Sequence, residues 1–164
     1  MLAFIQSCGL AGIEGFDVTV EVNLAHGMPM FEIVGLPDAS VKESRERVRA
    51  ALKNSGYTFP AGRITVNLAP ADLKKEGPAY DLPIALGLLA CVGAIDPDSF
   101  KHTCVIGELS LDGSVRPVRG VLPMVIFARS IGMKAVMVPR DNLAEVSCIE
   151  GISILGAGSL LQAS

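Results

Sequence analysis

The chain has 164 residues, of which 50% are hydrophobic, 19% charged and 5% aromatic, and its formal net charge is −3. This length fits one ordinary domain that buries about 70% of its unfolded surface, and the apolar content excludes a disordered segment. The acidic balance argues against a nucleic-acid-binding surface covering the whole chain, although a local basic patch stays open.

The first residues, MLAFIQ, lack the basic region followed by an apolar run that marks a signal peptide. No run of about 20 apolar residues is present to span a bilayer, so we expect a cytoplasmic protein without membrane contact. The four cysteines form no CxxC pair. We expect plain thiols in the core or on the surface, and neither a metal site nor a disulfide.

The first third of the chain is predicted to be rich in β-strands. Apolar and polar residues alternate over residues 16–24, which is typical of a strand with one buried face. A turn at residues 26–29 leads to a second strand over residues 31–34, and we expect these two strands to pair as an N-terminal β-hairpin. A third strand is predicted over residues 63–68, ending before Pro70.

Two helices of different character are predicted next. Ser40 and Glu43 have the spacing of a capping box and would open a helix that runs to Ser55 and ends at Gly56. Its expected buried stripe consists of Val41, Ser44, Val48, Ala51 and Leu52. The second helix, residues 81–92, is apolar nearly all round, which predicts a central helix buried on several sides.

The second half reads as a strand over residues 104–109, a turn at Asp112-Gly113 and a returning strand to residue 118. Helices around residues 121–131 and after Asp141 alternate with strands over residues 134–138 and 152–155, and a last helix begins at Ser159. Strands first and βαβ units later predict an α/β sandwich with a mixed sheet. We expect a single domain over residues 1–164.

Three segments are too long and too polar to be explained by hydrophobic patterning: VGLPD at 34–38 with VKESRERVR at 41–49, SGY at 55–57, and VNLAPADLKKEG at 66–77 with DLPIALG at 81–87. In this order and spacing they resemble the amino-terminal domain of the ComM/YifB family of magnesium-chelatase-like AAA+ ATPases. The resemblance covers essentially the whole chain. It implies a Lon proteolytic-domain-like fold with a mixed β-sheet and packed helices, followed by an AAA+ ATPase module.

The resemblance also implies function. A family member is associated with natural transformation, as a hexameric helicase that drives branch migration of DNA. The resemblance implies as partners DNA and further copies of the same protein, in a hexamer. ATP and Mg would bind in the AAA+ module expected after residue 164, with no cofactor in this chain. The only GxG, residues 156–158, is expected to be a strand-end turn because no GxxxxGK[ST] is present.

The Lon family uses a Ser-Lys dyad, in which a lysine activates the serine. Here Ala79 stands where the resemblance places the serine, and Leu122 where it places the lysine. A methyl group cannot attack a carbonyl, so we expect no catalytic residues and no Ser or Thr hydroxyl within reach of a lysine amine near Ala79.

His26 and His102 lack further ligands for a metal. Asp81, near Asp72 and Glu76, is expected to be an N-cap or first-turn residue.

One surface feature has a functional alternative. Lys42, Arg45, Arg49 and Lys53 lie on one face of the first predicted helix, and Lys74 and Lys75 could extend this basic stripe. Such a stripe could neutralise phosphates without reading bases. It could also be a subunit contact or a solvated face, with Glu43 pairing Arg47 and Glu46 pairing Arg49.

The leading hypothesis is a noncatalytic domain for assembly or DNA engagement. The alternatives are a protein-interaction module and, weakest, a residual hydrolase.

Overall fold

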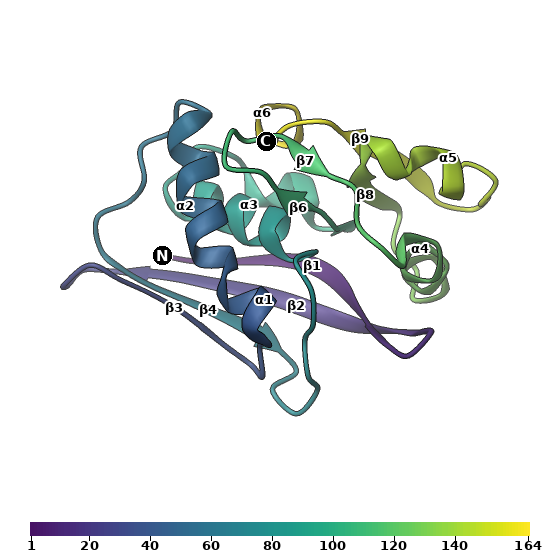
Figure 1. The fold of residues 1–164 in the computed structure, drawn as a ribbon, viewed down its shortest axis with the longest axis horizontal. Coiled ribbons are helices and arrows are strands. Elements are labelled where there is room, and N and C mark those ends of the chain that lie inside the picture. Colours follow the sequence, from purple (N-terminus) through teal and green to yellow (C-terminus); the bar gives the residue numbers. More distant parts are fainter.

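The computed structural model describes residues 1–164 and has a seven-stranded mixed sheet with helices on both faces (Figure 1). The order in the sheet is β3-β4-β2-β1-β5-β8-β9, and β6 and β7 form a separate two-stranded ribbon. The α/β class and the mixed sheet predicted from the sequence are confirmed. The strands are β1 (Leu2–Ala11), β2 (Glu14–Ala25), β3 (Met30–Val34), β4 (Arg63–Ala69), β5 (Thr103–Val105), β6 (Glu108–Leu109), β7 (Val115–Arg116), β8 (Ala135–Pro139) and β9 (Ser153–Ala157).

Six α-helices and two short 3-10 turns connect these strands. None of the helices is long and apolar enough to cross a membrane. The helices are α1 (Ala39–Lys42), α2 (Ser44–Asn54), α3 (Asp81–Cys91), α4 (Val121–Ser130), α5 (Leu143–Val146) and α6 (Leu160–Ala163), with 3-10 turns η1 (Pro97–Phe100) and η2 (Arg140–Asn142).

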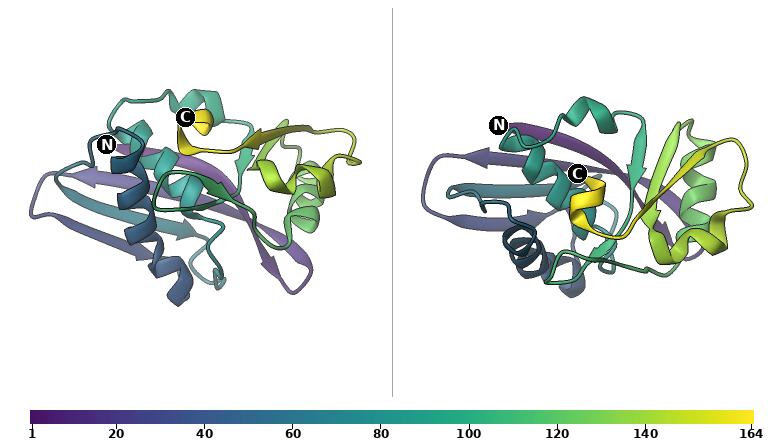
Figure 2. Two further views of the ribbon diagram at one scale, coloured as in Figure 1. Left: turned by 45° about the horizontal axis from the view of Figure 1, so that its top comes forward. Right: turned by 90° about the horizontal axis from the view of Figure 1, so that it is seen from above.

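Helix α3 is the centre of the larger core. Every residue from Asp81 to Cys91 is buried, as its apolar character predicted. It packs on the long strands β1 and β2 next to α2, and the turned views in Figure 2 show α6 on this same side of the sheet. Gly87 allows the close approach, since a Cβ there would lie 2.5 Å from Cγ2 of Val22.

A second core lies on the opposite face of the sheet, beneath α4 and α5. Strand β8 separates the two cores: Met137 belongs to the larger one, whereas Val136 and Val138 pack with α4. This half of the sheet is parallel and covered on both faces, which explains why its strands read as continuous apolar runs. The helices and strands predicted between residues 121 and 163 are present with small shifts in their bounds.

The predicted pairing of residues 16–24 with residues 31–34 is wrong. The N-terminal hairpin is formed instead by β1 and β2, and β4 lies between β2 and β3. Strand β4 buries Ile64, Val66 and Leu68, so a central position removes the most apolar surface from water. Short β3, whose outer residues Met30 and Val34 are exposed, takes the edge.

The predicted capping box is also wrong. The N-cap is Asp38, whose Oδ1 accepts a 2.8 Å hydrogen bond from the Val41 N–H, and the helix is interrupted at Glu43 into α1 and α2. The predicted buried stripe and the end at Gly56 are confirmed. There the Tyr57 N–H bonds Leu52 O at 3.0 Å and the Gly56 N–H bonds Lys53 O at 3.1 Å, which is a Schellman ending.

The strand predicted over residues 104–109 is divided into β5 and β6 at Gly107. This residue bonds the start of α3 instead of a strand, with its N–H donating to Ala79 O at 2.9 Å and its carbonyl accepting from Leu82 N at 3.0 Å. The turn at Asp112-Gly113 joins β6 and β7 as predicted. Gly107 therefore ties the ribbon to the beginning of the central helix.

Candidate functional site

Ala79 lines a cavity of about 700 Å³ where several parts of the fold meet. The end of β1 supplies Cys8 and Leu10, the loop before α3 supplies Ala79 and Tyr80, and α4 supplies Met124. Tyr80 is 1% exposed, and burial raises the pKa of its hydroxyl well above the ordinary value. The Ala79 side chain offers this cavity a methyl group and no nucleophile.

The other position that the resemblance assigned to the dyad lies elsewhere. Leu122 is on α4, 38% exposed, and is not among the residues that line the cavity. The lysines nearest to Ala79 in sequence have other contacts. Lys74 Nζ lies 3.5 Å from Glu76 Oε1, and the Lys75 amine donates to Gly35 O at 2.8 Å and to Pro70 O.

Lys75 is completely buried, which corrects its assignment to the basic surface stripe. Desolvation lowers the pKa of its amine, against the raising charge of Asp72. Its backbone N–H donates to Leu36 O at 3.0 Å, and its carbonyl accepts from Asp38 N at 2.9 Å. Lys75 thus fastens the loop before α3 to the loop before α1. Lys75 lies in a polar segment without regularly spaced apolar residues, so the sequence did not indicate that it is buried.

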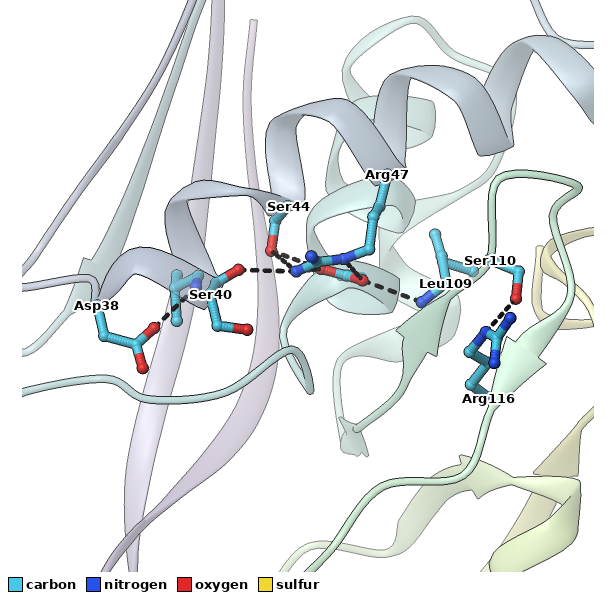
Figure 3. Close-up of polar contacts among 9 residues, drawn as sticks. Asp38, Ser40, Ser44, Arg47, Leu109, Ser110 and Arg116 are labelled. Atoms are coloured by element: carbon cyan, nitrogen blue, oxygen red, sulfur yellow. Dashed lines mark hydrogen bonds and ion pairs between the residues drawn. The ribbon is translucent and has the colours of Figure 1, made fainter.

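The buried carboxylate of Asp81 joins the two long helices α2 and α3. Its partners Ser44, Arg47 and Leu109 are labelled in Figure 3. Asp81 is the first residue of α3, as predicted, but its side chain contacts α2 instead of capping its own helix. Arg47 donates to both carboxylate oxygens, at 2.6 Å and 3.1 Å. Ser44 Oγ donates at 2.5 Å, and the Leu109 N–H at 3.0 Å. The expected pairing of Glu43 with Arg47 is therefore wrong.

Burial affects the pKa values of both Asp81 and Arg47. Desolvation raises the pKa of the Asp81 carboxyl, although the hydrogen bonds from Arg47 and Ser44 act in the opposite direction. For the Arg47 guanidinium burial alone would lower the pKa, but the bond and charge of Asp81 raise it. Two-pronged bonding of this kind fixes geometry as well as charge. The pair locks α2, α3 and β6 into one rigid unit.

The basic stripe is divided between α1, which carries Lys42, and α2, which carries the other three predicted residues. Lys42, Arg45 and Lys53 are exposed and have no carboxylate within ion-pair distance. Arg45 lies against the edge of the sheet, donating to Lys42 O at 3.1 Å and Phe31 O at 3.4 Å. Three cations are therefore free to meet an anion in solution.

Arg49 differs from its neighbours in the stripe. It is half-buried, with its guanidinium carbon 4.8 Å from the ring centre of Phe59, so part of its charge is engaged in a cation–π contact. Its Nε is enclosed without a hydrogen-bond partner, and no ion pair joins it to Glu46. Lys74 is exposed, beside Glu76. The structure therefore does not bring all six predicted cations together.

The other candidate ligands are dispersed. His26 and His102 are exposed, and no group of three or more His, Cys, Asp or Glu side chains is arranged to hold a metal ion. The four cysteines are free: Cys148 is exposed and the others are buried. Cys8 and Cys104 lie 3.1 Å apart between their sulfur atoms, and this contact together with burial raises the pKa of Cys104.

The fold is that of a Lon-like α/β domain, and comparison with known proteins assigns its family. Residues 20–142 match the family described as subunit ChlI of Mg-chelatase. This is well over half of the chain, so the chain belongs to this magnesium-chelatase-like family.

Several named relatives are similar over nearly the whole chain. It is 42% identical to the competence protein ComM of Haemophilus influenzae over 160 residues, which is 98% of this chain and 31% of that protein. Identity to YifB of Escherichia coli is 43% over 159 residues, 97% of this chain and 31% of that protein. Lon protease 2 of Bacillus subtilis is 31% identical over 115 residues, 70% of this chain and 20% of that protein. The chain spans about a third of the length of ComM and YifB.

The polar partners of Asp81 and the polar residues of the cavity were not identified from the sequence. Ser44 interrupts an otherwise apolar buried stripe, and Arg47 follows it by three residues on α2. A polar residue in such a stripe indicates a buried hydrogen bond, and Asp81 at the start of an all-apolar helix was the available partner. Tyr80, Glu108 and the loop at residues 117–119 gave no signal, because only the folded chain brings them together.

Proposed function

We propose that this chain is a noncatalytic domain of a ring-forming, magnesium-chelatase-like AAA+ ATPase that acts on DNA in the cytoplasm, and that its α1–α2 face contacts the DNA backbone. The observation that carries this proposal is the set of three exposed, unpaired cations Lys42, Arg45 and Lys53. Lysine and arginine that neutralise phosphates bind DNA without regard to sequence, as a motor that moves along DNA requires.

The proposal does not depend on catalysis within the chain. Ala79 cannot act as a nucleophile, and the Lys75 amine is occupied by two carbonyl oxygens. ATP and Mg would bind in the AAA+ module carried by the rest of the protein. The similarity to a competence protein supports a role in handling DNA during transformation or recombination, with branch migration as the motor's task.

Binding through one domain is expected to be weak, since the chain is acidic overall with a net charge of −3. In a ring of six identical subunits, the same face would be repeated around the pore. Linked sites raise the effective concentration of one another. The assembled ring should therefore bind DNA more tightly than a single domain with its three weak contacts.

The test is charge reversal of Lys42→Glu with Arg45→Glu in the protein that carries its motor module. We expect weaker DNA binding and a log-log salt slope that becomes shallower by about 1.4–1.8 per subunit engaged, because two phosphate contacts are lost. The matched control is Lys101→Glu with Lys134→Glu, which changes the charge equally at two other exposed lysines.

A second candidate function is a protein-interaction module that recruits recombination partners without touching DNA. The same variants separate the two. An unchanged salt slope and an intact ring, measured by light scattering, would refute DNA contact at this face. A broken ring would show that α1–α2 is a subunit contact instead.

A further inference from the structure

The cavity beside Ala79 contains a polar group that the fold does not use. The hydroxyl of Tyr80 has no hydrogen-bond partner, although the residue is 1% exposed. Arg49 Nε is the only enclosed polar side-chain atom without a partner, so the Tyr80 oxygen is open to the cavity that this residue lines. It lies over Gly9, 2.6 Å from the position that a Cβ would take. A hydroxyl that has no protein partner and faces a cavity is available to hydrogen-bond a ligand.

The charges around this hydroxyl favour a cation. Asp38, Glu76 and Glu108 line the cavity, against one guanidinium, Arg119. Asp38 uses its oxygens for the N–H groups of Val41 and Gly77. Glu108 makes no hydrogen bond or ion pair through its carboxylate, and Glu76 has only the exposed Lys74, at 3.5 Å. Exposed pairs of this kind contribute little, so both glutamates are free to take a positive ligand.

The rest of the lining is apolar. Leu10, Val118 and Met124 face the same space, and side chains of this type pack against a hydrocarbon chain. A ligand that satisfies all of these groups has an aliphatic stem and a cationic head with several N–H donors. We propose that this cavity binds a primary alkylammonium group, either the side chain of a lysine presented by a protein segment or a free diamine.

This inference goes beyond the proposed function, because it concerns another face and another partner. The Tyr80 phenol is held neutral by burial, which raises its pKa, so its oxygen can accept a hydrogen bond from an ammonium group. Arg119, Asp38, Cys8 and the backbone of the loop before α3 are the other groups that face the cavity. Of these only Arg119 opposes a cation, and it is exposed to solvent, where its charge is screened.

The test is an NMR titration of the chain with cadaverine and with the peptide acetyl-Gly-Lys-Gly-amide. We expect saturable shifts of the amide signals of Gly77, Ala79 and Tyr80, with dissociation constants on the order of millimolar for so few contacts. Pentanol and the same peptide with an acetylated lysine carry the stem without the charge and should not bind. Whichever of the two amines binds more tightly identifies the source of the ligand.

Variants assign the binding to these residues. Glu108→Gln and Glu76→Gln should each weaken binding about tenfold and Tyr80→Phe about threefold, in line with charged and neutral hydrogen bonds. Glu32→Gln, an exposed acid on β3, is the control and should change nothing. The proposal is overturned if neither amine shifts these signals at about 20 mM, if pentanol shifts them equally, or if the cavity variants bind like the control.

Discussion

Replacing Arg47 with Met tests whether the buried ion pair holds the two helices together. The substitution keeps most of the side-chain volume but removes both bonds to Asp81, at 2.6 Å and 3.1 Å. The Asp81 side chain is 0% exposed, whereas that of Arg47 is 18% exposed. Removing one partner of a buried pair costs about 3–5 kcal/mol, because the other charge stays buried. Since Arg47 is partly open to water, we expect the lower end, about 3 kcal/mol.

The effect should depend on pH in a defined direction. Desolvation already raises the folded-state pKa of Asp81, and losing Arg47 raises it further. A carboxyl with a raised folded-state pKa destabilises the fold where it is ionised. This penalty falls as the pH drops through the raised folded-state pKa, and it is gone below the unfolded-state pKa of about 4. The difference between variant and wild type should therefore be largest near neutral pH and narrow on acidification.

Urea unfolding monitored by circular dichroism at several pH values measures both quantities. Arg45→Met, on the same helix but exposed and without a carboxylate partner, is the matched control and should cost less than about 0.5 kcal/mol. Adding Asp81→Asn to Arg47→Met should recover part of the loss at neutral pH. A loss below about 1 kcal/mol, or one independent of pH, would refute the assignment of the pair as the link between α2 and α3.

Three further predictions concern the core, the cap and the cavity. Gly87→Ala should lower the unfolding free energy by roughly 1 kcal/mol in urea titrations, because overpacking against Val22 costs about 1–3 kcal/mol and exceeds the helix propensity gained; a stabilised variant would show that the α3–β2 contact is loose. Asp38→Ala should cost about 1 kcal/mol in the same assay through loss of the α1 cap, and Asp38→Asn, which can still accept, should cost less; equal losses would contradict this. A serine-directed fluorophosphonate probe should not label the chain, and labelling would show a reactive hydroxyl that Ala79 does not provide.

Helices and strands whose apolar residues recur at regular spacing were predictable from the sequence. The pairing of strands across the sheet was not. The apolar run of α3 and the stripe of α2 indicate helices and their buried faces directly. The alternation in β2 reports one buried face but not which strand lies beside it. Only the burial of β4 against β2 decides that β3 moves to the edge, and this contact joins residues more than forty positions apart in the pair Val22 and Val66.

The candidate site shows the same division. The expectation that Ala79 stands in place of a nucleophile comes from a resemblance, and the basic character of the helix face could be read from spacing. That Lys75 is buried and that Arg49 lies against Phe59 could not, since each depends on a loop folding back over another element. Charged residues are nearly always exposed, so a buried lysine is the exception that composition cannot reveal.

Photo-crosslinking from the α1–α2 face tests most directly the proposal that this face contacts DNA. A benzoylphenylalanine at Glu46, an exposed position between Arg45 and Lys53 on α2, leaves every cation of the stripe in place. The same residue at Lys134, before β8, is the control. In the assembled protein with DNA and ATP, we predict crosslinks from position 46 to DNA that decline with added salt, and none from position 134. Crosslinks from position 46 to a neighbouring subunit alone, or no difference between the two positions, would contradict the account.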